Sequence, residues 1–205
     1  MKRLAVVFCL FVSLSGFAQQ DRKRNELGLT LGAELIPSRS AASQPLDFAN
    51  SIVFGANYAR HLAGVNTQLY FEVPFAAAPR HDISTRNSGS IRNLATLYVT
   101  PSFRVQFGGR SRLSPWISGG FGYGLYEGSA LLFDGSKNPR RYTSSGTAQF
   151  GAGVDLGTGL KIIFPIRLRG EVRDFYTVSN AAFGVPVNGP GQHNIQASGG
   201  IVLSF

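Results

Sequence analysis

Cysteine is almost absent from this chain of 205 residues, which has only Cys9. A lone cysteine can form no internal disulfide and cannot build a cysteine-ligated metal site. Long apolar runs are absent as well. The one strongly apolar stretch, Leu4 to Leu14, is shorter than the roughly 20 residues that a membrane-spanning helix needs. The sequence therefore excludes a disulfide-stabilised scaffold, and beyond the N-terminal stretch it offers no segment that could span a membrane as a helix.

The first residues have the three parts of a secretory signal. Met1–Arg3 is a short basic region, Leu4–Leu14 is an apolar core, and Gly16–Ala18 offers small residues at the cleavage positions. We expect residues 1–18 to be a signal peptide and residues 19–205 to form one domain. An N-terminal membrane anchor is the alternative. A lipoprotein is not expected, because the single cysteine lies inside the apolar core without the small residues of a lipid-attachment site.

Basic residues outnumber acidic ones, 20 to 11, which gives a net charge of +9. Loss of the signal removes Lys2 and Arg3, and leaves 18 basic and 11 acidic residues and a net charge of +7. These charges lie in Gly-, Pro- and Ser-rich connectors or singly at alternate positions, whereas nucleic-acid-binding proteins gather them on one face. We expect no nucleic-acid partner. Because metal-ligand spacings and phosphate-binding glycine motifs are also missing, we expect no metal and no cofactor.

An alternation of apolar and polar residues with a period of two recurs along the chain, and no segment shows a helical stripe. In the last segment, apolar residues such as Ile195 and Ile201 fall on one face and polar residues such as Gln196 on the other. Pro101 is an irregularity, because proline in a strand usually marks a bulge or an edge. The alternation predicts eight strands, at residues 26–35, 50–60, 65–75, 94–107, 115–126, 147–156, 162–176 and 195–205.

The connectors between these strands alternate between long and short. The long ones are predicted at 36–49, 76–93, 127–146 and 177–194. This parity fits an up-and-down barrel in which both termini and the short turns share one end. A soluble antiparallel barrel or sandwich is the alternative, but the polar faces are rich in the Gly, Ser, Thr and Gln of a crowded interior. The predicted fold class is all-β: an eight-stranded antiparallel up-and-down transmembrane β-barrel.

Four segments, Ser114–Tyr123, Gln149–Asp155, Leu168–Phe175 and Ile201–Phe205, resemble the eight-stranded outer-membrane β-barrels of OmpA/OmpX type. The resemblance implies a monomeric integral protein of the Gram-negative outer membrane, with both termini in the periplasm and four loops outside the cell. It also implies outer-membrane lipid and lipopolysaccharide as partners. The barrel-assembly machinery is a further implied partner, through the C-terminal strand ending at Phe205. The family shares a wall and differs in its loops, so the resemblance does not specify a function.

Charged residues alternate onto the inward face of the predicted strands. An eight-stranded barrel is just wide enough to be filled by its own side chains, so these charges must pair to offset the cost of desolvation. Inward-facing glycines on 115–126 and 147–156 leave room for long arginine side chains. We expect a structural ion-pair network, with a selective proton or ion path as the alternative. Its expected members are four acids and four bases: Glu34, Glu72, Asp155, Glu171, Arg104, Arg167, Arg169 and Arg173.

The three histidines are candidates for catalysis, because some small outer-membrane barrels act on lipid A. His61 falls in a predicted periplasmic turn, His81 in the second outer loop, and His193 at the outer rim on the lipid-facing side. The segment His81–Ser84 offers an imidazole, a carboxylate and a hydroxyl, but on a predicted loop and not on a rigid wall. Chance proximity of such common residues is the simpler explanation.

A second segment, Tyr176–Ala181, resembles in outline the nucleophile segment of lipid A deacylases with this architecture. Thr177 stands where those enzymes carry a histidine. Without an imidazole to take its proton, Ser179 is not activated as a nucleophile. We therefore expect no catalytic residues and no enzymatic activity.

Any binding is expected in the loops. The apolar segments Ala130–Phe133 and Ala181–Val185 indicate that the loops pack on one another. We expect a structural or surface-recognition protein that displays four extracellular loops; the alternatives are a narrow ion-conducting pore and an outer-leaflet lipid A hydrolase. The candidates for contacting lipopolysaccharide phosphates, host surfaces or other polyanions are basic loop residues, for which solvated charge is the simpler explanation: Arg80, Arg86, Arg92, Lys137, Arg140 and Arg141.

Overall fold

The computed structural model describes residues 24–41, 44–86, 89–109, 111–161, 164–178 and 191–205. The expected signal peptide, residues 1–18, lies outside these residues. Strands make up the fold, and the described residues include no helix long and apolar enough to cross a membrane. The strands are β1 (Asn25–Leu35), β2 (Arg39–Ala41), β3 (Gln44–Phe48), β4 (Ser51–Gly64), β5 (Thr67–Thr85), β6 (Asn93–Val99), β7 (Ser102–Phe107), β8 (Leu113–Gly128), β9 (Tyr142–Lys161), β10 (Pro165–Thr177) and β11 (Ile195–Ser204).

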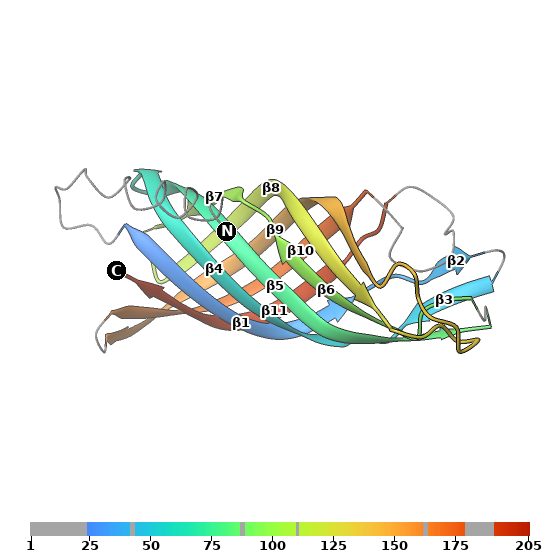
Figure 1. Ribbon diagram of the computed structural model, residues 1–205. Helices are drawn as coiled ribbons and strands as arrows, with labels where there is room; N and C mark the ends of the chain where they lie inside the picture. The colour runs from blue at the N-terminus through green and yellow to red at the C-terminus, as the bar shows by residue number, and fades with distance from the viewer. Residues whose placement is uncertain (1–23, 42–43, 87–88, 110, 162–163, 179–190) are drawn as a thin grey trace, which may run out of the picture.

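The strands form a closed antiparallel ring (Figure 1). Each wall strand pairs with the next one along the chain, and β6 and β7 together occupy one place in the ring, between β5 and β8. The ring closes where β1 pairs with β11, from Glu26↔Ser204 to Leu35↔Ile195. This is an eight-stranded up-and-down barrel, as predicted, and closure leaves its wall without an unpaired edge.

The faces of the wall follow the alternation of the sequence. Leu29 and Ile117 point outward, with 48% and 56% of their surface exposed. Glu72 and Arg104 point into the lumen and are fully buried. Because side chains alternate between the two faces of a strand, one apolar set covers the outside of the barrel and one polar set fills its inside.

The wall strand that contains β6 and β7 is interrupted at Thr100 and Pro101. Pro101 has no N–H to donate to the ladder, but its carbonyl accepts the N–H of Phe121 at 3.2 Å. Gly120 lies opposite, where a Cβ would come within 2.3 Å of the Pro101 carbonyl oxygen. The expectation of an irregularity at Pro101 is confirmed, and Gly120 lets the neighbouring strand approach it.

The wall extends further at one end than the sequence indicates. Strand β5 continues to Thr85, so the predicted loop 76–93 is largely strand. Strand β8 ends at Gly128 and β9 begins at Tyr142, so the predicted loop 127–146 is shorter at both ends. The first long connector contains the β2–β3 hairpin, which pairs with the end of β5 through Leu46↔Thr85. In Figure 1 this hairpin lies at the right, opposite the C-terminus. We call the hairpin, the ends of β5, β8 and β9, and the connectors beside them the cap.

The cap has its own apolar core. Buried residues from the first three long connectors and the adjoining strands pack together, among them Ile36, Leu46, Ile83, Ile91 and Leu132. An isolated bridge pairs Ile91 with Leu132, so the second and third long connectors are joined. The expected packing between loops is therefore confirmed for Ala130–Phe133 at Leu132, whereas Ala181–Val185 lies outside the described residues.

Candidate functional site: an ion-paired lumen beneath a packed cap

Glu72, on β5, is the centre of the lumen network. Its carboxylate accepts a hydrogen bond from Arg173 at 2.9 Å and lies 3.6 Å from Arg104 Nε. The Asn57 amide at 2.8 Å and the Ser102 hydroxyl at 3.2 Å complete its partners. All these groups are buried, so the carboxylate is stabilised by charge and by hydrogen bonds from three different strands besides its own.

A second centre lies at Asp155. Arg169 donates to both carboxylate oxygens of Asp155, at 2.7 and 2.8 Å, and the Trp116 indole N–H donates at 3.3 Å. Glu26 joins the two centres, because it pairs with Arg104 and lies 3.8 Å from Arg169. Glu26 is a further member of the network beyond those predicted, and its inward parity is that of Gly28 and Thr30.

Two predicted members have smaller roles. Glu171 contacts one arginine, Arg173, at 3.1 Å, and accepts the Ser198 hydroxyl at 3.2 Å. Arg167 donates to the Ser114 hydroxyl and, among the described residues, has no carboxylate within ion-pair distance. The prediction that Arg167 pairs with a lumen acid is therefore wrong.

Glu34 is a clear correction to the predicted network. It is buried, but its hydrogen-bond donors are neutral: Thr96 at 2.9 Å, Tyr98 at 3.1 Å and Gln196 at 3.3 Å. Its neighbour is His81, whose Nε2 lies 3.7 Å from Glu34 Oε2. Parity along a strand assigns Glu34 to the inward face but does not say which neighbours lie at its height in the barrel.

One indole lies at the centre of the arginines. The guanidinium carbons of Arg169 and Arg173 lie 5.1 and 5.0 Å from the Trp116 ring centre, and that of Arg104 lies 5.8 Å away. Arg104 also stacks over Tyr70 at 4.4 Å. Cation–π contacts of this kind gain strength away from water. Together these buried side chains fill the lumen at this height.

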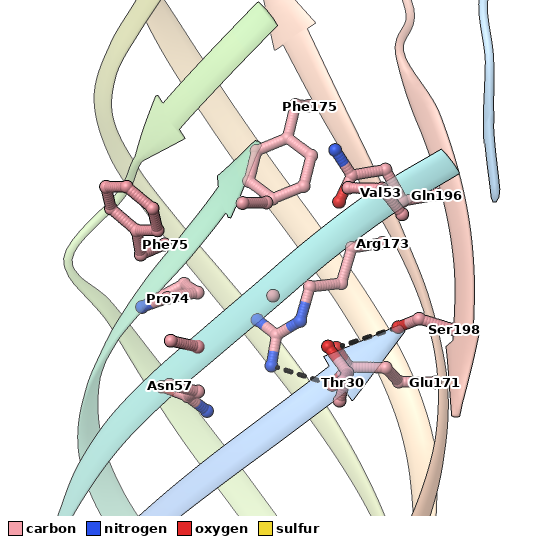
Figure 2. A pocket seen from close by; sticks show the side chains of 13 residues that line it. Thr30, Val53, Asn57, Pro74, Phe75, Glu171, Arg173, Phe175, Gln196 and Ser198 are labelled. Carbon is pink, nitrogen blue, oxygen red and sulfur yellow. Dashed lines mark hydrogen bonds and ion pairs between the residues drawn. The ribbon is translucent and has the colours of Figure 1, made fainter. Parts of the chain in front are cut away.

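A small cavity lies on the cap side of Arg173. Its volume is about 10 Å³, close to what one water molecule requires. Figure 2 shows Arg173 pointing into this space and reaching Glu171, which also accepts the hydrogen bond from Ser198. Phe175, above it, stacks on Tyr98 at 4.6 Å between ring centres.

Gly153 makes room for Trp116, and this gives a testable prediction. A Cβ at Gly153 would come within 2.5 Å of the indole and 2.6 Å of the Gly170 carbonyl oxygen. We expect Gly153→Ala to lower the free energy of unfolding by about 1 to 3 kcal/mol, the usual cost of overpacking. Gly170→Ala is the matched control, because nothing lies within 4 Å of its Cβ position. Equal unfolding midpoints for the two variants would contradict the tight packing described.

The three histidines lie in three different surroundings. His81 lies on strand β5 and not in a loop, and it points inward, whereas Ser84 points outward, so the two side chains face opposite sides of the wall. His61 lies at the end of β4 and contacts the Gly64 carbonyl oxygen at 3.1 Å. His193 pairs with Asp174 at 2.7 Å on the outer surface. Ser179, which we expect not to be activated, lies outside the described residues.

The six basic loop residues divide into two groups. Arg80 pairs with Asp82 at 2.8 Å, Arg141 pairs with Glu127, and Arg92 donates to the Leu132 carbonyl at 2.9 Å. All six side chains are exposed to solvent, including those of the remaining three, Arg86, Lys137 and Arg140.

The tip of the third connector is ordered by its own hydrogen bonds. The Ser136 hydroxyl and backbone N–H donate to Asp134 at 2.6 and 2.8 Å, and they hold the pKa of that carboxyl below its usual value. Gly135, between them, has a φ of 84° that favours glycine. Among the described residues, no three His, Cys, Asp or Glu side chains gather as metal ligands.

Comparison with solved structures agrees with this geometry. Neisserial surface protein A superposes with a TM-score of 0.50 at 12% sequence identity, over 91% of this chain and 100% of that one. The fold is that of the small outer-membrane barrels. Two further matches are the N-terminal β-barrel domain of Pseudomonas aeruginosa OprF (TM-score 0.48, 12% identity, 89% and 98% covered) and Yersinia pestis Ail (0.47, 13%, 88% and 99%). Neither a family model nor a curated protein sequence matches the chain.

Proposed function

We propose that this protein is an integral barrel of the bacterial outer membrane that displays a packed extracellular cap and has no enzymatic activity. The observation that supports it best is the contrast between the two faces of the wall. Large apolar side chains such as Phe103, Phe150 and Leu168 are exposed on the outside, while arginines and acids are buried within. A soluble barrel would have the opposite arrangement, whereas lipid around the wall removes the cost of this exposure.

The lumen supports a structural role over conduction. Trp116 and the arginines around it occupy the cross-section of the barrel, and the adjacent cavity has room for about one water molecule. The cap core closes the outer end above them. We therefore propose that the barrel anchors the cap and does not conduct ions.

The cap is the surface that meets the exterior in this proposal. Its exposed basic side chains include Arg86, Lys137 and Arg140, and its exposed apolar ones include Leu131 and Phe133. A fixed basic and apolar surface favours an anionic partner, for which lipopolysaccharide around the barrel is the nearest source. The exposed C-terminal Phe205 is the proposed contact for the barrel-assembly machinery, and the chain is proposed to be a monomer.

Proteolysis of intact cells tests the proposed orientation. Trypsin added outside should cut at exposed bonds of the cap, at Arg86 or Arg140, and should spare Arg60 and Arg112 at the opposite end. Mass spectrometry of the released and retained peptides identifies the cut. Cleavage after Arg112 in sealed cells would invert the orientation, and lysed cells provide the control in which Arg112 becomes accessible.

A further inference from the structure

Glu34 differs from the other buried acids of the lumen. Its side chain is fully buried, yet no arginine or lysine among the described residues lies within ion-pair distance of it. The donors that reach it are two hydroxyls and an amide, from Thr96, Tyr98 and Gln196. Its negative charge therefore has no permanent countercharge, and a proton is the charge that can balance it.

His81 is placed to share that proton. Its Nδ1 lies 2.9 Å from the Ala49 carbonyl oxygen. Because a carbonyl only accepts, Nδ1 must carry a hydrogen. Its Nε2 faces Glu34 Oε2 at 3.7 Å and has no hydrogen-bond partner in the described part of the chain, although the ring is fully buried. At this distance a proton on Nε2 makes the contact an ion pair between an imidazolium and the carboxylate.

A bulge in β5 turns His81 toward the lumen. Ala76 and Ala78 face inward, and the pairing with β6 then shifts register between Ala78 and His81. After the shift His81 and Ile83 face inward, while Asp82 faces outward. Bulges commonly re-aim a side chain in this way. With unbroken alternation Asp82 would point inward in place of His81.

Among the described residues, the groups around Glu34 and His81 offer no free charge to compensate a change in the net charge of the pair. The titratable groups that face it are the phenols of Tyr98 on β6 and Tyr126 on β8. From β11 it meets the neutral Gln196. Arg173, on β10, is already held by Glu72 and Glu171. The apolar core of the cap includes Tyr98, Tyr126 and Phe175 of this same region.

We propose that Glu34 and His81 form a buried proton-binding site that acts as an acid-sensitive latch of the cap. With one shared proton the pair has no net charge, and the His81 Nδ1–H holds Ala49, the residue that follows the β2–β3 hairpin. Uptake of a second proton leaves a buried cation without an anion, which is costly in an apolar surround. The β2–β3 hairpin then separates from the barrel, so the extracellular surface responds to pH.

Hydrogen exchange of the protein in lipid nanodiscs tests the latch. After correction for the intrinsic pH dependence of exchange, the amides of Arg39–Phe48 should lose protection about tenfold between about pH 7 and about pH 5. His81→Gln keeps an amide donor for Ala49 but cannot take up the second proton, so it should show no such loss. His61→Gln and His193→Gln, the matched controls, should behave as the wild type does.

Two results would overturn the proposal: an unchanged cap in the wild type at about pH 5, or the same loss of protection in His81→Gln. A heat-dependent shift in electrophoresis at neutral pH shows whether His81→Gln is folded. Glu34→Gln provides an independent test, because it removes the carboxylate that shares the proton and should move the midpoint of the transition. A midpoint identical to that of the wild type would exclude Glu34 from the site.

Discussion

Glu72→Gln should lower the free energy of unfolding by about 3 to 5 kcal/mol, the cost of breaking one side of a buried ion pair. The amide has the same size as the carboxylate, so packing is kept while Arg173 and Arg104 lose the anion that they share. Unfolding in guanidinium, followed in lipid vesicles, should show a lower midpoint with a similar slope. Glu72 is a better target than Glu171, which among the described residues forms an ion pair with Arg173 alone.

Glu127→Gln is the matched control for that experiment. Glu127 also pairs with an arginine, Arg141, but both side chains are exposed at the rim. Exposed ion pairs contribute little to stability, so the unfolding midpoint should stay where it is. If Glu72→Gln were as harmless as Glu127→Gln, the lumen network would not be what holds the barrel together.

Val172→Arg should lower the free energy of unfolding by about 2 to 4 kcal/mol, because it puts a charge at mid-depth on the lipid face. Val172 lies in the middle of β10, points outward, and is 52% exposed. In a soluble barrel an arginine at this position would extend into water with little effect. Folding yield and unfolding midpoint in lipid vesicles measure the difference.

Leu131→Arg is the control, because Leu131 is similarly exposed, at 42%, but belongs to the cap. There the new charge should meet water and leave stability unchanged. If neither Val172→Arg nor Leu131→Arg lowered the unfolding midpoint, the outside of the wall would not contact hydrocarbon. If both variants lowered the midpoint equally, the cap would lie inside the membrane.

The faces of the wall could be predicted from the sequence because one chemical contrast holds along every strand. Outward residues meet one environment and inward residues another, so a period of two assigns Ile117 to the outside and Arg104 to the inside. The ends of the strands could not be predicted in the same way. Beyond the apolar band β5 continues by pairing with β6 and β3, and β9 by pairing with β8, and this backbone pairing cannot be read from the sequence.

The partners inside the lumen could not be predicted either. Parity gives a residue's face, but the height at which it meets another strand depends on the tilt and stagger of the barrel. For this reason parity groups Glu34 with arginines that it does not contact. Glu26 is different, because its parity, which is that of Gly28 and Thr30, does place it on the inward face. His81 was assigned to a loop because the bulge before it interrupts the alternation.

Tryptophan fluorescence in vesicles of brominated lipid tests the two-faced wall most directly. The protein has one tryptophan, Trp116, which is buried in the lumen, and Phe103→Trp adds a second on the exposed outer face. Bromine on the acyl chains quenches an indole that touches them. The structure predicts weak quenching of the wild type and strong quenching of the added tryptophan. Strong quenching of Trp116 together with an unaffected Trp at position 103 would contradict the account, because it would put the lipid on the charged face.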